Sequence, residues 1–74
     1  MDHVIEKTVK FQLNGESYLV ESESTIQSLL KELSLVDKRV AIEVNQQIVP
    51  RSQYNDYIIQ PDDQVEIIVA IGGG

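Results

Sequence analysis

The residues with the clearest chemical potential are three glycines, Gly72, Gly73 and Gly74, which follow an apolar segment at the end of the sequence. Glycine has no side chain and is conformationally permissive, so such a tail can enter a narrow slot in another protein. Its terminal carboxylate is a chemical handle, because an ATP-using enzyme can convert it to an acyl-adenylate that a sulfur or nitrogen nucleophile then attacks. The alternative interpretation is a flexible end without a function, since chain termini are often disordered.

Side chains elsewhere in the sequence offer little for catalysis. Cysteine is absent, so the sequence provides no thiolate nucleophile, disulfide or cysteine-based metal site. His3 is the only histidine and lies in a polar N-terminal stretch, where we interpret it as a surface residue. Asp62 and Asp63 follow Pro61 and are interpreted as turn residues rather than a catalytic carboxylate pair. We therefore expect no catalytic residues, no bound metal and no bound cofactor, which predicts that the chain is not an enzyme.

Length and composition predict a single acidic domain. The sequence has 74 residues, 42% of them hydrophobic, and a net charge of −6. That hydrophobic content is too high for a disordered tail, and the negative charge argues against nucleic acid as a partner. The longest apolar run covers only residues 67–71, which predicts no membrane span. The first residues do not read as a secretory signal, so a cytoplasmic location is expected.

A β-hairpin is predicted near the start of the sequence. Apolar and polar residues alternate over residues 9–13, as in a strand that buries one face. Asn14 and Gly15 follow directly, and this dipeptide is typical of a tight turn with positive φ at both positions. The alternation then resumes at Tyr18 and Val20, which indicates the returning strand.

The main helix is predicted over residues 25–33. Ser24 and Gln27 have the spacing of a capping box, which satisfies free amide donors in the first helical turn. Four apolar residues share one helical stripe: Ile26, Leu29, Leu30 and Leu33. We expect this stripe to pack against the hairpin.

The middle of the sequence predicts two further strands and a short helical turn. Residues 39–44 return to period two, and residues 45–47 form a polar turn. Ile48 and Val49 form a short apolar return that ends at Pro50, which places this piece at a sheet edge or strand end because proline lacks an amide donor. A short helical turn is predicted within residues 51–57.

The last strand is predicted over residues 64–71 and is apolar on both sides. One side carries Val65, Ile67, Val69 and Ile71, and the other carries Ile68 and Ala70. Such strands are central in a sheet or covered on both faces. Together the elements predict an α+β fold in which a mixed sheet wraps around one main helix.

The order of these elements and several local segments resemble the ThiS family of ubiquitin-like sulfur carriers. The segments are LNGE at residues 13–16, Thr25-Ile26 with Leu29-Leu30, AIEVN at 41–45, NQQIVPR at 45–51 and DDQVEI at 62–67. The resemblance covers residues 7–74 and implies a ubiquitin-like β-grasp fold. We expect a single domain at residues 1–71 and a flexible tail at residues 72–74. Residues 1–6 precede the usual first strand of the family and are interpreted either as a frayed extension or as extra edge pairing. The family commonly ends in two glycines, whereas this sequence ends in three.

The resemblance implies a carrier cycle at Gly74. A ThiF-type adenylyltransferase would adenylate this residue with ATP, and sulfur from a cysteine desulfurase relay would displace AMP to leave a thiocarboxylate. A ThiG-type thiazole synthase would then take the sulfur for thiazole formation in thiamine biosynthesis. Gly72 and Gly73 would serve as the flexible stalk, and the partners would supply all the catalytic groups.

Three other functions remain open from the sequence. The small subunit of molybdopterin synthase has the same fold and the same tail chemistry but a different sulfur acceptor. A ubiquitin-like modifier would instead join its terminal glycine to lysines. A non-covalent docking module would use the sheet face and leave the glycines without a role.

Partner contacts are expected near the tail. Ile68, Ala70 and Ile71 form a candidate docking patch if the helix does not cover them. Arg51 is a candidate contact for an acidic partner surface, although a solvated arginine after a proline needs no partner. The net negative charge also favours partners with basic docking surfaces, through electrostatic steering.

Overall fold

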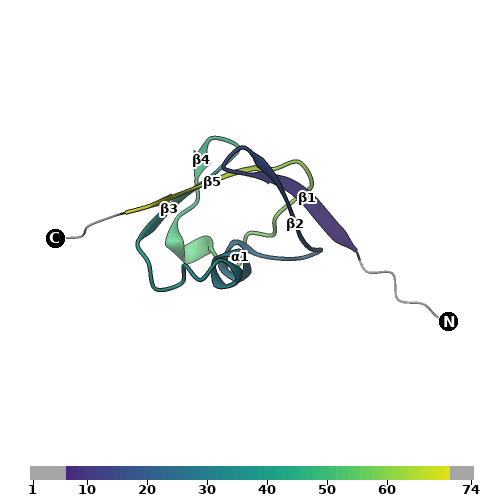
Figure 1. The fold of residues 1–74 in the computed structure, drawn as a ribbon. Coiled ribbons are helices and arrows are strands. Elements are labelled where there is room, and N and C mark those ends of the chain that lie inside the picture. Colours follow the sequence, from purple (N-terminus) through teal and green to yellow (C-terminus); the bar gives the residue numbers. More distant parts are fainter. Residues whose placement is uncertain (1–6, 71–74) are drawn as a thin grey trace.

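The computed structural model describes residues 7–70, and these form a mixed five-stranded sheet over one α-helix (Figure 1). In chain order the elements are β1 (Thr8–Leu13), β2 (Glu16–Glu21), α1 (Ile26–Glu32), β3 (Val40–Val44), β4 (Gln47–Ile48), the 3₁₀ helix η1 (Arg51–Gln53) and β5 (Gln64–Val69). The strand order across the sheet is β2-β1-β5-β3-β4. The predicted mixed sheet around one main helix is confirmed. Residues 1–6, with the predicted frayed extension, lie outside the described residues.

The predicted hairpin is confirmed by the pairing of β1 and β2. Asn14 and Gly15 form its turn with φ values of 51° and 85°, the left-handed conformations that a tight hairpin turn requires. Phe11 lies opposite Tyr18, and their rings meet edge to face with centroids 5.8 Å apart. The Tyr18 hydroxyl donates to Glu32 at 3.1 Å, which joins the hairpin to the end of α1.

The helix covers Ile26–Glu32 instead of the predicted residues 25–33, and its cap lies one residue later than predicted. Thr25, not Ser24, is the N-cap, and its hydroxyl oxygen accepts from the Ser28 amide at 3.1 Å. The Ser28 hydroxyl accepts from the Thr25 amide at 2.9 Å and so takes the place that Gln27 was expected to fill. A serine can complete the capping box because Ser28 lies one helical turn after Thr25, where its hydroxyl reaches the Thr25 amide. The apolar stripe is confirmed, with Ile26, Leu29 and Leu30 buried.

The second short strand is shifted by one residue from its prediction. Asn45 and Gln46 make the turn with positive φ, so β4 is Gln47–Ile48 rather than residues 48–49. Ile48 consequently points outward and is 74% exposed, whereas Val49 is buried. The edge position of β4 is confirmed, and η1 confirms the predicted helical turn.

The predicted central place of the last strand is confirmed, because β5 lies between β1 and β3. It pairs parallel to β1 over only two positions and antiparallel to β3 over five, from Val44 opposite Val65 to Val40 opposite Val69. Its described part ends at Val69 rather than residue 71, and Ile71 lies outside the described residues. Only one of its faces is covered, since Val65 and Ile67 are buried while Ile68 is exposed.

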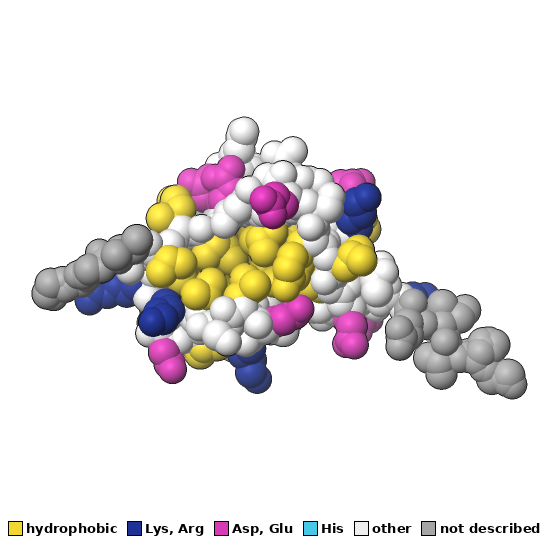
Figure 2. Space-filling view, viewed as in Figure 1, with side chains coloured by type: hydrophobic (Ala, Val, Ile, Leu, Met, Phe, Trp, Pro, Cys, Tyr) yellow, Lys and Arg dark blue, Asp and Glu magenta, His cyan; other side chains and the backbone are white. Residues whose placement is uncertain are grey.

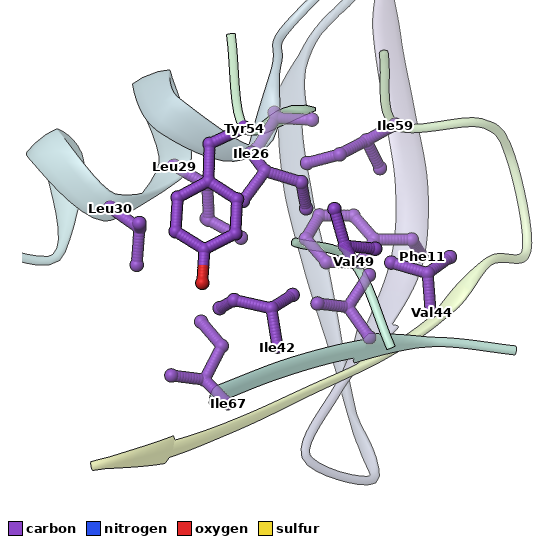
Figure 3. Packing of buried hydrophobic residues seen from close by; sticks show 12 residues of the cluster. Phe11, Ile26, Leu29, Leu30, Ile42, Val44, Val49, Tyr54, Ile59 and Ile67 are labelled. Carbon is purple, nitrogen blue, oxygen red and sulfur yellow. The ribbon is translucent and has the colours of Figure 1, made fainter. Parts of the chain in front are cut away.

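The core fills the space between the sheet and α1 (Figure 3). Phe11 and Ile42 from the sheet and Ile26 and Leu29 from the helix are fully buried, and they meet beside Ile59 from the loop before β5. Full burial of such a side chain contributes about 1.5–3 kcal/mol. The whole buried apolar set is Phe11, Val20, Ile26, Leu29, Leu30, Ile42, Val44, Val49, Tyr54, Ile59, Val65 and Ile67.

Candidate functional site

The predicted tail residues lie outside the described part of the chain. Ile71, Gly72, Gly73 and Gly74 therefore have no structural account, and the structure instead shows the strand that leads to them. At the end of that strand, Val69 lies opposite Val40, and the Ala70 amide donates to the Arg39 carbonyl at 2.9 Å. The chain is thus paired to β3 as far as Val69, and its last described residue is bonded to the residue just before β3.

The start of β5 is fixed by Asn45 in the turn after β3. The Asn45 side-chain oxygen accepts from the Gln64 amide at 2.9 Å, and its main-chain amide donates to the Gln64 carbonyl at 2.8 Å. The Asn45 side-chain nitrogen also donates to Asp63 at 2.9 Å. One residue from the NQQIVPR segment therefore joins directly to the DDQVEI segment.

Asp63 is a buried hydrogen-bond acceptor rather than a plain turn residue, which corrects the prediction for this position. It is 6% exposed, and besides Asn45 it accepts from the Tyr57 hydroxyl at 2.8 Å and the Gln60 amide at 2.9 Å. Burial, followed by the hydrogen bond and charge of Asp63, raises the pKa of Tyr57 to about 12. Asp62 is exposed, as predicted. By accepting these three hydrogen bonds, the Asp63 carboxylate holds the loop that enters β5.

Asn14 supports β5 where β1 has already ended. Its main-chain amide donates to the Val65 carbonyl at 2.8 Å, and its side-chain oxygen accepts from the Ile67 amide at 2.8 Å. The Asn14 side chain thus provides the hydrogen bond that a neighbouring strand would otherwise provide at Ile67 of β5. The sequence signal for Asn14 was read as a turn, and its second role could not be seen because Ile67 is 53 positions away.

The outer face of the sheet, turned away from α1, presents the predicted contact residues. Ile68 is 60% exposed and lies opposite Ala41, and Ala70 is also exposed. Next to them, Glu43 lies directly opposite Glu66. The structure therefore selects the exposed alternative for Ile68 and Ala70 over the covered one.

Arg51 does not join these residues. It is exposed on η1 and lines a hollow with Leu30 of the helix and Val40, whose side chain faces the core side of the sheet. Lys38 lines the same hollow and was missed from the sequence, because no motif marks it. Ile68 and Arg51 are thus parts of two surfaces, one on each side of the sheet.

Two features are absent from the described part of the chain. Within residues 7–70, no three His, Cys, Asp or Glu side chains gather in a way that could hold a metal ion. In that same range, no helix has the length and apolar character needed to cross a lipid bilayer. The features that the structure does provide are a fixed strand and two exposed surfaces near its end.

Comparison with known proteins gives the family. Residues 6–74 match the ThiS family. The sulfur carrier protein ThiS of Escherichia coli is 34% identical over 61 residues, which cover 82% of this chain and 92% of that protein. A thiazole synthase of Magnetococcus marinus is 39% identical over 66 residues, which cover 89% of this chain but only 20% of the synthase. The chain thus spans about a fifth of the length of that relative.

A solved structure agrees with the sequence matches. The crystal structure of the thiamine biosynthesis protein ThiS from Geobacter metallireducens superposes with a TM-score of 0.74 at 25% identity, covering 89% of this chain and all of that one. The expected ubiquitin-like β-grasp fold is confirmed by this likeness and by the strand order described above. The chain belongs to the ThiS family.

Proposed function

We propose that this chain carries sulfur on the carboxylate of Gly74 for thiazole formation in thiamine biosynthesis. The observation that carries the proposal is the family match, which extends through residue 74 and so includes all three glycines. The match favours the thiamine carrier over the small subunit of molybdopterin synthase. The sequence itself supplies the carboxylate to be activated and no nucleophilic cysteine of its own.

In the proposed cycle the chain is the substrate of partner enzymes. A ThiF-type adenylyltransferase joins AMP to the Gly74 carboxylate and releases pyrophosphate from ATP. The persulfide of a cysteine desulfurase relay attacks the acyl-adenylate and displaces AMP. A thiol reductant then cleaves the resulting acyl disulfide and leaves a thiocarboxylate, which is a better nucleophile than a carboxylate. A ThiG-type thiazole synthase then takes the sulfur and returns the carboxylate. The similarity of this chain to a fifth of a thiazole synthase supports the choice of that last partner.

The described residues support a carrier role by fixing the strand before the tail. Asn14 and Asn45 hold β5 through side-chain bonds to Ile67 and Gln64, and β3 pairs with it as far as Val69. A rigid element close to the reacting end reduces the conformational freedom that a partner must restrict on binding. The chain therefore delivers its tail from a defined position on a folded surface.

The outer sheet face is the proposed contact for the enzymes that receive the tail. Ile68 and Ala70 are exposed apolar residues, and Ala41 lies opposite Ile68. Exposed apolar patches of this kind are typical of protein-binding surfaces. Ile71 continues the same sequence and belongs to the proposed contact. Arg51 lies at the hollow on the other side of the sheet and is not part of this contact.

Reconstitution with purified partners tests the proposed function. The full chain and a variant that ends at Gly72 are each incubated with ATP, a ThiF-type adenylyltransferase and sulfide, and both pyrophosphate and the intact mass are measured. We expect the full chain to release pyrophosphate and to exchange one oxygen for sulfur, and the shortened chain to do neither. Equal behaviour of the two chains would contradict the proposal. Higher-mass conjugates joined through lysine would instead show a ubiquitin-like modifier.

A further inference from the structure

We propose that a basic hollow beside the end of β5 docks an acidic segment of the adenylyltransferase, an inference that rests on the proposed function. The basic hollow has a volume of about 210 Å³ and lies between α1, the start of β3 and η1. The residues that define it here are Leu30, Leu35, Val36, Lys38, Val40 and Arg51. These residues come from α1, from the loop that follows it, from β3 and from η1. The hollow is therefore formed by the folded domain itself.

The charge of the basic hollow is opposite to that of the whole protein. Lys38 and Arg51 are both exposed at the hollow, and Arg39 directly precedes β3. These three residues are half of the six Lys and Arg in a sequence whose net charge is −6. Lys and Arg side chains gather near the end of the domain where β5 ends (Figure 2). A partner with an acidic surface is therefore repelled by most of the molecule and attracted to this end, which orients the encounter.

The apolar residues that line the basic hollow indicate that its occupant also carries an apolar group. Val36 is 46% exposed there, and Leu30 and Val40 form part of the same lining. A small inorganic anion would satisfy the two cations but would leave this apolar surface in water. A peptide segment with a carboxylate next to an apolar side chain satisfies both, since the carboxylate accepts from Lys38 and Arg51 while the apolar group covers Val36. We therefore assign a peptide of this chemistry to the hollow.

The position of the basic hollow links docking to the tail. Val40 lines the hollow and lies opposite Val69, and the Arg39 carbonyl accepts from the Ala70 amide at 2.9 Å. A segment held at the hollow is thus next to the strand that leads toward Gly74. The enzyme that adenylates the tail gains a fixed reference point at the base of that strand, on the face of the sheet opposite to Ile68.

Charge-removing variants test the docking proposal. Lys38→Gln and Arg51→Gln each remove one charge at the hollow, and Lys7→Gln removes the same charge from an exposed residue just before β1 as a matched control. Calorimetric titration against a ThiF-type adenylyltransferase at low and high salt gives the dissociation constants. We expect each hollow variant to raise the dissociation constant about fivefold at low salt and to flatten its salt dependence, with the control within about twofold of wild type. Carbodiimide cross-linking should also join Lys38 to an Asp or Glu of the enzyme.

The outcomes separate this inference from the proposed function. Equal dissociation constants for all three variants, or no cross-link at Lys38, would overturn the docking proposal. If the hollow variants changed only the KM for ATP, Lys38 and Arg51 would be assigned to nucleotide binding. That result would also overturn the docking proposal. At saturating enzyme, the hollow variants should still be adenylated at the wild-type rate. If wild type itself is not adenylated, the proposed function fails, while the binding titration still reports on the hollow.

Discussion

β5 is held differently at its two ends. At its start, Asn45 and Asp63 form a connected set of hydrogen bonds, and Asn14 adds another at Ile67. Among the described residues, side-chain hydrogen bonds to β5 reach no further than Ile67, and the last positions are paired to β3 through main-chain atoms. The start of the strand thus sets its register and direction.

The end of β5, in contrast, lies between two surfaces that are open to a partner. Ile68 is exposed on the outer face of the sheet, and Lys38 and Arg51 are exposed at the basic hollow on the other side. Side-chain hydrogen bonds hold one end of the strand, while exposed apolar and charged groups lie beside the other. The proposed partner contacts are therefore at the opposite end of this six-residue strand from the end that these bonds fix.

The largest effect on stability is expected from removing the acceptor at the start of β5. Asp63→Ala leaves the Tyr57 hydroxyl, the Gln60 amide and the Asn45 amide group without their partner, and we expect a loss of about 2–4 kcal/mol in the free energy of unfolding. Asp62→Asn removes the same charge at an exposed neighbour and keeps a residue type that tolerates its positive φ of 67°. Urea denaturation of both variants makes the comparison. Similar losses for the two would contradict the buried role of Asp63.

A smaller loss is expected from removing the support at Ile67. Asn14→Gly keeps the positive φ of 51° but loses the side-chain oxygen that accepts from the Ile67 amide, which should cost about 1–1.5 kcal/mol. Asn14→Asp keeps that oxygen and serves as the matched control, with a loss below about 0.5 kcal/mol expected. Thermal denaturation measures both. The role of the side chain would be wrong if aspartate were as damaging as glycine.

The raised pKa of Tyr57 predicts a loss of stability at high pH. The folded state holds this proton to a pKa of about 12, whereas the unfolded state releases it near the ordinary value of 10.0. The stabilisation is therefore complete below pH 10 and is lost as the pH rises from 10 toward 12. The free energy of unfolding of wild type should fall more steeply over that window than that of Tyr57→Phe. Parallel pH curves for the two proteins would contradict this account.

The smallest effect is expected on the outer face and has the opposite sign. Glu43 and Glu66 lie directly opposite each other, and like charges in this arrangement are destabilising. Glu66→Gln should therefore raise the free energy of unfolding by about 0.2–1 kcal/mol at low salt, and less at high salt because screening weakens the repulsion. Glu21→Gln, in which the replaced residue lies opposite Thr8, is the control. A destabilised Glu66→Gln variant would show that the two carboxylates do not repel each other.

Much of the fold could be predicted because its signals are local. Asn14 and Gly15 indicated the hairpin turn, and the apolar stripe of the helix indicated its buried side. The errors were also local in kind: Thr25 replaced Ser24 as the cap, and β4 began one residue earlier than expected, because neighbouring residues gave nearly equal patterns.

The long-range roles of the polar residues that hold β5 could not be predicted. Asp63 depends on Asn45, which is 18 positions away, and Asn14 depends on Ile67 at a distance of 53 positions. Period and spacing contain no information on such partners. Lys38 and Arg51 likewise come together at the basic hollow only through the packing of α1 against the sheet.

The most direct test of the central claim is the mass of the tail in protein purified from cells that contain its native partners. Trypsin cuts after Arg51, and no Lys or Arg follows, so residues 52–74 form one C-terminal peptide. We predict that part of this peptide gains the mass difference between sulfur and oxygen, with no such change elsewhere in the chain. A tail that stays unmodified, even after addition of ATP, adenylyltransferase and a sulfur donor, would contradict the account and favour a docking module whose glycines do no chemistry.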